Sequence, residues 1–265
     1  AITFKLIPLW NEHMPTGASK IKKRTFPEKE LKVVYFPSCI TRSMGTSQSY
    51  GKEKEITRMT EALLTAAGYQ IIYPENMNNL CCGMLFSSKG YVETGKKASD
   101  ELKAALIKAS ENGKYPVLCD MSPCLYTMRT NMEGELKLYE PAEFIDKYLL
   151  DRLELKPVDE KVAIFAVCSA KQMEVESNLE NVARRCAREV VIVDSNCCGF
   201  AGDRGFFFPE LNQHGLRDLE KQSEGCSHGY ATSRTCEIGL SRHSGIEFKS
   251  IIYLAAQAAG IDTSK

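Results

Sequence analysis

Short runs of apolar, often β-branched residues alternate along this chain with longer segments whose apolar residues recur at helical spacing. The short runs predict strands and the longer segments predict helices. Strands that alternate with helices are typical of parallel α/β proteins. The predicted strands are 32–37, 70–73, 115–119, 136–139, 161–167, 189–194 and 228–233, and the predicted helices are 53–67, 91–112, 176–187, 209–222 and 249–259.

The order of these elements is repeated, since the second half of the chain follows the first. A charged, proline-bearing joint at Leu155–Pro157 separates the halves. We therefore predict an α/β fold of two similar parallel-sheet repeats, with helices on the sheet faces and a pseudo-twofold axis between the repeats. The predicted domains are residues 31–156 and 157–265. Residues 1–30 are polar and aperiodic and predict an extended linker or arm without a core.

Eight of the eleven cysteines follow one pattern twice. In each half a lone cysteine closes the first apolar run, an adjacent pair followed by glycine comes after the second run, and another cysteine follows the third. The eight are Cys39, Cys81, Cys82 and Cys124 in the first half, and Cys168, Cys197, Cys198 and Cys236 in the second. Between the lone cysteine and the pair lie 41 residues in the first half and 28 in the second, so the first half has an insertion of 13. We place it in the polar stretch 41–52, as a longer loop.

Each set of four thiols follows the carboxyl ends of strands, where ligands collect in parallel α/β sheets. The pattern therefore predicts a four-cysteine site in each half, suited to zinc or to an iron–sulfur cluster. Neighbouring side chains on an extended backbone point to opposite sides, so an adjacent pair would bind one ion only with strain. Zinc ligands are usually spaced by two to four residues. The pairs therefore favour a 4Fe-4S type of cluster, with zinc as the alternative.

Several other residues are candidates for supporting these sites. Gly83 and Gly199 would let backbone amides approach the sulfurs, and a helix beginning there would stabilise thiolate charge. Asp203 and Arg204 place a carboxylate and a guanidinium after the second pair. They would tune the site or guide an electron acceptor, or else serve as a helix cap and a surface charge.

Composition narrows the function classes. The 34 basic and 34 acidic residues cancel, which argues against nucleic acid as a partner. No stretch approaches the roughly 20 apolar residues that span a bilayer, and no export signal opens the chain. We therefore predict a cytoplasmic protein, with peripheral association with the inner membrane as a variant. Eleven cysteines in such a chain indicate reduced thiols. Cys186 and Cys226 lie outside the repeated pattern, and we expect their side chains to pack in the apolar core.

The longer motifs resemble the cysteine-rich CCG-domain family, which occurs in heterodisulfide reductase subunits, in the iron–sulfur subunits of glycerol-3-phosphate and glycolate oxidation, and in FAD-linked D-lactate dehydrogenases. The similarity is strongest to the last group. It is carried by Cys197–Phe206, Pro209–Leu211 and Thr232–Ser241, and by the N-terminal Pro8–Asn11 and Met14–Pro15. The resemblance implies that the eight cysteines bind iron–sulfur clusters, or zinc in one repeat.

The chain departs from the family's fuller pattern in one respect. The family ends each repeat with two cysteines separated by two residues, but the first of these positions is Met121 in one repeat and Ser233 in the other. Cys119 lies two residues earlier and has Ala231 as its counterpart. A four-thiolate site, or one that recruits Cys119, is therefore expected rather than a five-thiolate noncubane cluster.

By the same resemblance, the chain would be the electron-transfer part of an enzyme that oxidises a D-2-hydroxy acid such as D-lactate or glycolate. FAD and ferredoxin-like clusters would lie in upstream domains, an expectation that agrees with a chain whose first residue is Ala1. The acceptor would be a quinone, a cytochrome or another protein, and the isolated chain would be inactive. The alternatives are a zinc-stabilised docking scaffold and a thiol–disulfide exchange module.

Overall fold

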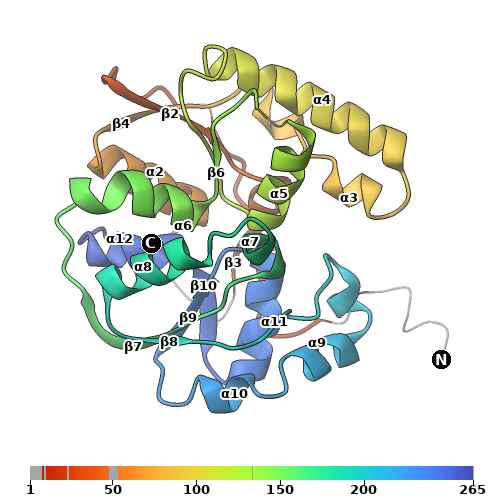
Figure 1. Cartoon of the computed structure of the whole chain (residues 1–265), viewed down its shortest axis with the longest axis vertical. Helices are drawn as coiled ribbons and strands as arrows, with labels where there is room; N and C mark the ends of the chain where they lie inside the picture. The colour runs from red at the N-terminus through yellow and green to blue at the C-terminus, as the bar shows by residue number, and fades with distance from the viewer. Residues whose placement is uncertain (1–7, 9, 23, 48–52, 133, 265) are drawn as a thin grey trace.

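Two parallel four-stranded sheets, one from each half of the chain, form the framework of the molecule (Figure 1). The computed structural model describes residues 8, 10–22, 24–47, 53–132 and 134–264. The first sheet has the order β4-β2-β5-β6 and the second has the order β8-β7-β9-β10. The strands are β2 (Leu31–Phe36), β4 (Tyr69–Ile72), β5 (Val117–Cys119), β6 (Leu138–Tyr139), β7 (Val158–Ile164), β8 (Ala187–Ile192), β9 (His228–Ala231) and β10 (Glu247–Ser250).

The two sheets have the same topology. When the four strands of each sheet are numbered 1 to 4 along the chain, both sheets have the order 2-1-3-4. The first strand therefore lies between the second and the third, and the connections leave it in opposite directions. In such sheets ligands bind beyond the carboxyl ends of the first and third strands. The predicted fold of two similar parallel α/β repeats is confirmed.

Helices cover both faces of each sheet. In the first half they are α1 (Cys39–Ser43), α2 (Ile56–Ala66), η2 (Met77–Asn79), α3 (Met84–Ser87), α4 (Val92–Ala109), α5 (Ser122–Asn131), α6 (Pro141–Phe144), η3 (Ile145–Leu149) and η4 (Leu150–Arg152). In the second half they are α7 (Cys168–Gln172), α8 (Glu176–Cys186), η5 (Arg204–Phe206), α9 (Pro209–Gly215), α10 (Leu219–Gln222), α11 (Arg234–Ser244) and α12 (Ile251–Ala258).

Alternate residues of the central strands supply different cores. Val33 and Tyr35 of β2 face a large apolar cluster that also contains residues of the second half, whereas Val34 and Phe36 face a cluster under α4 and α5. In β7, Val162 faces the shared cluster in the same way. This period of two is what an extended strand imposes. The shared cluster lies between the sheets, where α2, α6, α8 and α12 pack together (Figure 1).

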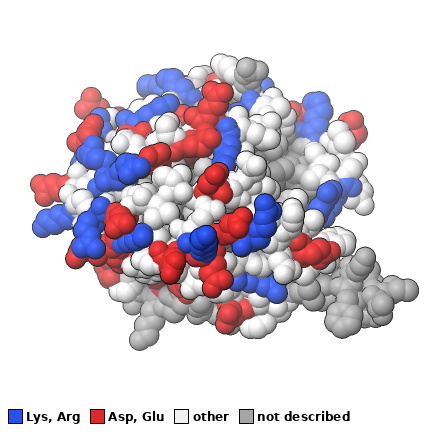
Figure 2. All heavy atoms as spheres, turned by 60° about the horizontal axis from the view of Figure 1, so that its bottom comes forward, with Lys and Arg blue, Asp and Glu red and all other residues white. Residues whose placement is uncertain are grey.

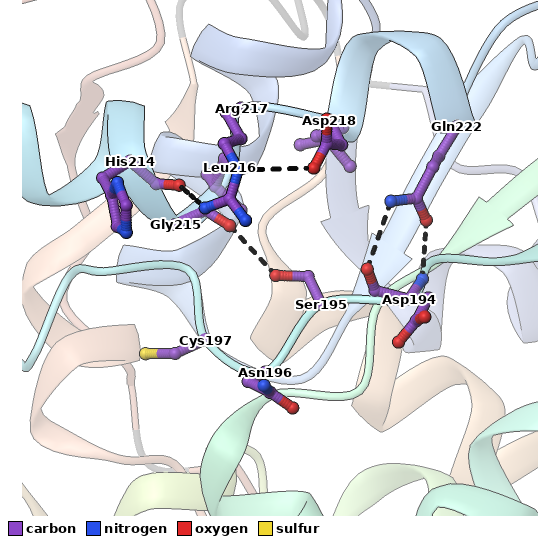
Figure 3. Close-up of a pocket in the computed structure, with 11 residues that line it drawn as sticks. Asp194, Ser195, Asn196, Cys197, His214, Gly215, Leu216, Arg217, Asp218 and Gln222 are labelled. Atoms are coloured by element: carbon purple, nitrogen blue, oxygen red, sulfur yellow. Dashed lines mark hydrogen bonds and ion pairs between the residues drawn. The ribbon is translucent and has the colours of Figure 1, made fainter.

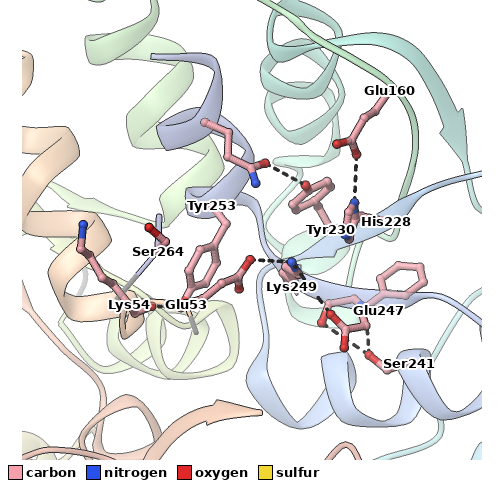
Figure 4. Close-up of polar contacts among 12 residues, drawn as sticks. Glu53, Lys54, Glu160, His228, Tyr230, Ser241, Glu247, Lys249, Tyr253 and Ser264 are labelled. Carbon is pink, nitrogen blue, oxygen red and sulfur yellow. Dashed lines mark hydrogen bonds and ion pairs between the residues drawn. The ribbon is translucent and has the colours of Figure 1, made fainter. Parts of the chain in front are cut away.

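Polar contacts also join the halves (Figure 4). Lys249 of β10 donates to Glu53 Oε1 at 2.6 Å, and the Tyr253 hydroxyl donates to the Lys54 carbonyl at 2.8 Å. Glu53 also pairs with Ser264 in an isolated antiparallel bridge. The two repeats therefore share an apolar core. The polar contacts of Lys249 with Glu53 and of Tyr253 with Lys54 form what we call the polar seam between them. The predicted boundary between residues 156 and 157 stays a prediction.

Several predicted elements differ from those observed. The predicted helix 209–222 is broken into α9 and α10, and α9 ends at Gly215. An added Cβ at Gly215 would lie 2.8 Å from the Cys197 carbonyl oxygen, so the glycine lets the loop of the cysteine pair approach closely. The predicted helix 249–259 begins two residues later, because 249 and 250 complete strand β10. Helices α5 and α11 were not predicted. Both follow strands that end at a proposed ligand loop.

The N-terminal arm is less independent than its sequence predicts. Residues Pro15–Gly17 form strand β1, which pairs antiparallel with β3 (Met44–Ser47). Part of the predicted insertion loop 41–52 is therefore a strand, and residues 48–52 lie outside the described residues. Phe26 and Met14 pack against two of the apolar clusters, which corrects the expectation that residues 1–30 contribute nothing to a core. The arm is held by backbone pairing, by these two side chains and by polar contacts such as that of Arg24 with Glu61 at 3.1 Å.

Charged side chains of both signs are interspersed on the face drawn in Figure 2. The close exposed pairs include Arg188–Asp159 at 2.5 Å and Lys96–Asp100 at 2.8 Å. Pairs of this kind contribute little to stability. Within the described ranges, no helix is both long enough and apolar enough to cross a membrane.

Candidate metal centre with two four-thiol sites

The lone cysteine of each repeat lies at the start of a short helix beyond the first strand. Cys39 begins α1 after β2, and Cys168 begins α7 after β7. In the first repeat Ser38 caps the helix, because its hydroxyl oxygen accepts the Thr41 amide at 3.1 Å. The position of each lone cysteine therefore follows from a strand end and a local helix start.

Asp120 connects this loop to the loop after the third strand. One carboxylate oxygen accepts the Ser38 amide at 2.9 Å, and the other accepts the Tyr35 hydroxyl at 2.8 Å. Burial raises the pKa of Asp120, although the Ser38 amide and the Tyr35 hydroxyl oppose that rise. Asp120 therefore holds the loop of Cys39 against the loop of Cys124. Its role was not predicted, since an Asp after a strand is common, and Thr232 replaces it in the second repeat.

The four thiols of the first repeat converge. Hydrogen-bond contacts link Cys39 to Cys81 and Cys124, and link Cys82 to Cys81 and Cys124. Cys82 and Cys124 are buried, whereas Cys39 and Cys81 are half-buried. Hydrogen bonds from the Cys39 and Cys82 thiols and from the Gly83 amide lower the pKa of Cys81 to about 2. These contacts favour the thiolate form of Cys81, which is the form that binds metals.

The second repeat has the same arrangement and is more open to solvent. Contacts link Cys197 to Cys168 and Cys198, and the sulfur atoms of Cys198 and Cys236 are 2.8 Å apart. Hydrogen bonds from the Cys168 and Cys198 thiols and from the Gly199 amide lower the pKa of Cys197 to about 2. Cys168 is exposed, so this site has a solvent-facing edge.

Each adjacent pair lies in a turn that glycine makes possible. Gly83 has φ +86° and Gly199 has φ +72°, and their amides donate to the Cys81 and Cys197 sulfurs at 3.4 and 3.3 Å. A Cβ on Gly83 would lie 2.1 Å from the Gly95 carbonyl oxygen. A helix, α3, begins after Gly83, but no helix begins directly after Gly199.

The turn places the two thiols of a pair differently from the sequence-based expectation. The adjacent thiols were expected to point to opposite sides, as in an extended strand, yet Cys81 contacts Cys82 and Cys197 contacts Cys198. Both thiols of a pair therefore face one site. The adjacency of the cysteines does not by itself favour a cluster over zinc.

Cys119 lies beside the first site. It is fully buried at the end of β5, and its charge would interact with those of Cys39, Cys82 and Cys124. Its thiol donates to the Met121 carbonyl at 3.8 Å, and burial raises its pKa. The Met121 sulfur accepts the Arg234 amide at 3.2 Å across the repeat interface. The position that carries a further thiol elsewhere in the family is therefore a contact between the repeats in this chain.

The two charged candidates after the second pair, Asp203 and Arg204, have different surroundings. Asp203 accepts Lys89 of the first repeat at 2.8 Å, whereas the Arg204 side chain is exposed. Asp203 therefore joins the segments that follow the two cysteine pairs. Their roles beside a metal centre stay predictions.

A pocket of about 450 Å³ opens beside the second site (Figure 3). Cys197 lies on one side of this pocket and His214 and Arg217 lie on the other. Its wall is ordered by the Ser195 hydroxyl, which donates to the Gly215 carbonyl at 3.1 Å, and by two hydrogen bonds between Asp194 and Gln222. The pocket shows how solvent reaches Cys197.

The donor set of each site fits a thiolate-bound metal or cluster. As placed, however, no group of three or more His, Cys, Asp or Glu side chains in the described part of the chain could hold a metal ion. In the second site the sulfurs of Cys198 and Cys236 are 2.8 Å apart, whereas the sulfurs of a tetrahedral zinc site are about 3.8 Å apart. The sulfurs would move apart to admit either metal or cluster.

The remaining cysteines pack in the core, as predicted. Cys186 is fully buried in the shared apolar cluster, and Cys226 is buried in the cluster of the second half. Burial raises the pKa of Cys186 to about 12. These two thiols are apolar core side chains.

The fold and the paired thiol sites define a duplicated cysteine-rich α/β protein. The family model of the CCG cysteine-rich domain matches residues 33–129 and 162–240. The chain therefore belongs to the CCG cysteine-rich domain family, as its motifs predicted. This family's cysteine-rich domain suggests an iron–sulfur cluster.

Known relatives agree with this membership. The chain is 24% identical over 223 residues to one of the subunits of the anaerobic glycerol-3-phosphate dehydrogenase of Escherichia coli strain K12, a match that covers 77% of this chain and 54% of that protein. The same subunit from Escherichia coli O157:H7 matches equally. The chain therefore spans about half the length of the curated relatives it matches.

Solved structures give weaker likenesses. The aspartate racemase of Picrophilus torridus has a TM-score of 0.37 at 6% identity, covering 89% of this chain and 96% of that one. The glutamate racemase of Aquifex pyrophilus has a TM-score of 0.38 at 10% identity, covering 88% and 85%. At such TM-scores no conclusion follows for this chain.

Proposed function

We propose that this chain is the iron–sulfur electron-transfer portion of an FAD-linked oxidoreductase. The observation that carries the proposal is the convergence of four thiols at the same strand ends in both repeats, each set with one strongly acidic thiol. An iron–sulfur cluster supplies one-electron transfer when it is bound. The proposed ligands of the first site are Cys39, Cys81, Cys82 and Cys124, with Cys119 as an additional candidate ligand. The proposed ligands of the second site are Cys168, Cys197, Cys198 and Cys236.

The residues around the thiols would serve this role in distinct ways. Gly83 and Gly199 bring amides to the sulfurs, and hydrogen bonds to ligand sulfurs are one means by which a protein sets a cluster's reduction potential. The exposed edge at Cys168 and the pocket beside Cys197 would let an acceptor approach the second site. The first site is more enclosed and would sit on the donor side.

The proposed substrate of the whole enzyme is a D-2-hydroxy acid such as D-lactate or glycolate, oxidised at a flavin in another part of the protein. Support comes from the similarity of Cys197–Phe206 and Thr232–Ser241 to FAD-linked D-lactate dehydrogenases. The name of the curated relatives suggests glycerol 3-phosphate as the competing substrate. Assay of the complete enzyme with all three compounds would separate these possibilities. The isolated chain is expected to oxidise none of them with a dye acceptor.

A zinc-stabilised scaffold is the second candidate, favoured by the turn that lets both thiols of a pair face one site. Anaerobically prepared protein would be analysed for iron, acid-labile sulfide and zinc. Iron with sulfide and a visible absorption that reductant bleaches would support electron transfer. Colourless protein with stoichiometric zinc would support the scaffold, and neither metal would support thiol–disulfide exchange.

Single substitutions test the ligand sets. Cys82→Ser and Cys198→Ser should each remove the metal of one site while the other site keeps its own. Cys186→Ala is the matched control, because Cys186 is a buried packing thiol outside both sites. Unchanged metal content in both serine variants would contradict the assignment.

A further inference from the structure

A basic side chain occupies the same place beside both thiol sites. Arg42 lies three residues after Cys39, and Lys171 lies three residues after Cys168. Both follow the lone cysteine by one helical turn, on α1 and α7. The cation recurs although the neighbouring residues differ between the repeats, which indicates that its position has a shared role.

Arg42 links the loop of the lone cysteine to the loop that leads into the pair. Its guanidinium donates from Nη1 to the Met77 carbonyl at 2.6 Å and from Nη2 to the Leu80 carbonyl. Nε donates to the carbonyls of Pro37 at 3.1 Å and Ser38 at 3.3 Å. Leu80 directly precedes Cys81, so a single side chain ties two ligand loops together.

Lys171 makes the corresponding link in the second repeat with one bond. Its Nζ donates to the Ser195 carbonyl at 2.8 Å, two residues before Cys197. The positive charge of Arg42 lowers the pKa of Cys81, and that of Lys171 lowers the pKa of Cys197, in each case as a minor cause beside the thiol contacts. Both side chains are half-buried, so water screens their charge only in part.

We propose that Arg42 and Lys171 are matched positioning cations, which hold the cysteine-pair loop against the lone-cysteine loop and offset the negative charge of the thiolate-bound centre. We call the contacts by which each cation holds the two loops its clamp. Arg42 donates to four carbonyl oxygens in two loops, whereas Lys171 donates to one carbonyl oxygen. Loop positioning should therefore depend more on the cation in the first site than in the second. The charge effect should be similar in both. The charge part of this inference rests on the proposed iron–sulfur function, whereas the clamp does not.

The test uses Arg42→Gln, Arg42→Lys, Lys171→Gln and Lys171→Arg, with Lys96→Gln as a control on an exposed face. Iron and sulfide per chain and the midpoint potential of each site would be measured after anaerobic preparation. Loss of supporting contacts around metal ligands commonly weakens retention by about 10–100-fold. We expect a loss of that order for Arg42→Gln and a smaller loss for Lys171→Gln.

The midpoint potential of each site separates the effect of the cation's charge from the effect of its contacts with the loops. Reduction adds negative charge, so a nearby cation favours the reduced form and either Gln variant should lower the potential of its own site. Arg42→Lys keeps the charge but loses most of the carbonyl contacts, so it should lose iron while the sites that remain keep the wild-type potential. Lys171→Arg should resemble the wild type. Gln variants that match Lys96→Gln in both iron content and potential would overturn the proposal.

Apo protein supplies a readout that needs no metal. Hydrogen exchange of the backbone amides of residues 77–83 should be faster in Arg42→Gln than in the wild type, with the far-UV spectrum unchanged. If the wild type carries no iron–sulfur cluster, the proposed function fails, and this measurement still decides the clamp. Unchanged exchange in that segment would overturn the clamp whatever the metal content.

Discussion

At the scale of single residues, each site depends on a glycine that no other residue replaces. Gly199 has φ +72°, and a Cβ there would lie 2.2 Å from the Leu211 carbonyl oxygen. It therefore combines a left-handed conformation with a close approach of two backbones. The turn it allows aims the Gly199 amide and both neighbouring thiols at one place.

The variant Gly199→Ala should destabilise the protein by at least about 2 kcal/mol, because the left-handed conformation alone costs an alanine about 1–2 kcal/mol and the clash adds to it. Gly202→Ala is the matched control, since Gly202 has φ +79° and nothing within 4 Å of an added Cβ. Denaturant midpoints compare the two variants. Equal losses would show that Gly199 is required for its conformation alone.

A buried carboxyl group at the repeat interface makes stability depend on pH. Glu140 is fully buried, its Oε2 lies 3.0 Å from the Ser122 hydroxyl, and that hydroxyl lies 2.7 Å from the Thr232 hydroxyl of the other repeat. Burial raises the pKa of Glu140 from 4.5 to about 7. The native state therefore keeps a proton that the unfolded chain releases between these values.

It follows that the contribution of Glu140 to stability is greatest below about pH 4.5 and falls as the pH rises to about 7. The variant Glu140→Gln, which mimics the protonated form, should remove this part of the decline. It should therefore raise stability relative to the wild type more at pH 8 than at pH 5. Urea unfolding at both values checks this, and a difference between variant and wild type that is the same at both would contradict it.

At the scale of elements, the helix that follows the fourth strand of each sheet starts from a side-chain cap. α12 begins after Ser250, whose hydroxyl oxygen accepts the Ile252 amide at 3.4 Å. The same place in the first repeat is taken by Glu140, which caps α6 through the Glu143 amide at 3.1 Å. Different residues thus serve one structural position in the two repeats.

Replacement of Ser250 tests the cap. Ser250→Ala should cost about 1 kcal/mol, whereas Ser250→Gly should cost a few tenths of that amount, since glycine is tolerated at this position. The expected order of stability is wild type, then glycine, then alanine. Thermal unfolding measures it, and an alanine variant as stable as the glycine variant would mean that the hydroxyl does not cap α12.

At the scale of the whole molecule, the two repeats act as one body because they share a core and a polar seam. Lys249 is 6% exposed and lies 2.6 Å from Glu53, which is 14% exposed (Figure 4). These residues are 196 positions apart and belong to different repeats. A nearly buried ion pair therefore closes one edge of the interface.

Removal of one partner should be costly, because it leaves a desolvated charge. Glu53→Ala is expected to destabilise the protein by about 3 kcal/mol, since Glu247 lies 3.9 Å from Lys249 and replaces the lost contact only in part. Lys54→Ala breaks the exposed pair with Asp262 and should cost less than about 1 kcal/mol. Equal denaturant midpoints for the two variants would show that burial does not strengthen the seam.

The sequence predicted seven of the eight strands of the two sheets, the duplication and the eight thiols, because each has a local signal: an apolar run, a repeated order or a cysteine at a strand end. It missed β10 (Glu247–Ser250), whose last two residues were assigned to the following helix. It missed α5 and α11, whose apolar residues are interrupted by polar ones. It also missed Arg42 and Lys171, although alignment of the repeats on Cys39 and Cys168 would have placed both at the third following residue.

The sequence by itself determined the fold class, the duplication and the candidate donor set, since these depend on residue type and on spacing along the chain. Tertiary structure decided what depends on distance across the chain. It brought Cys198 to Cys236, Asp120 to Ser38 and Lys249 to Glu53, and it turned each adjacent cysteine pair so that both thiols face one site. The physical reason is that such contacts join loops that the sheets hold together, and no local pattern records which loops those are.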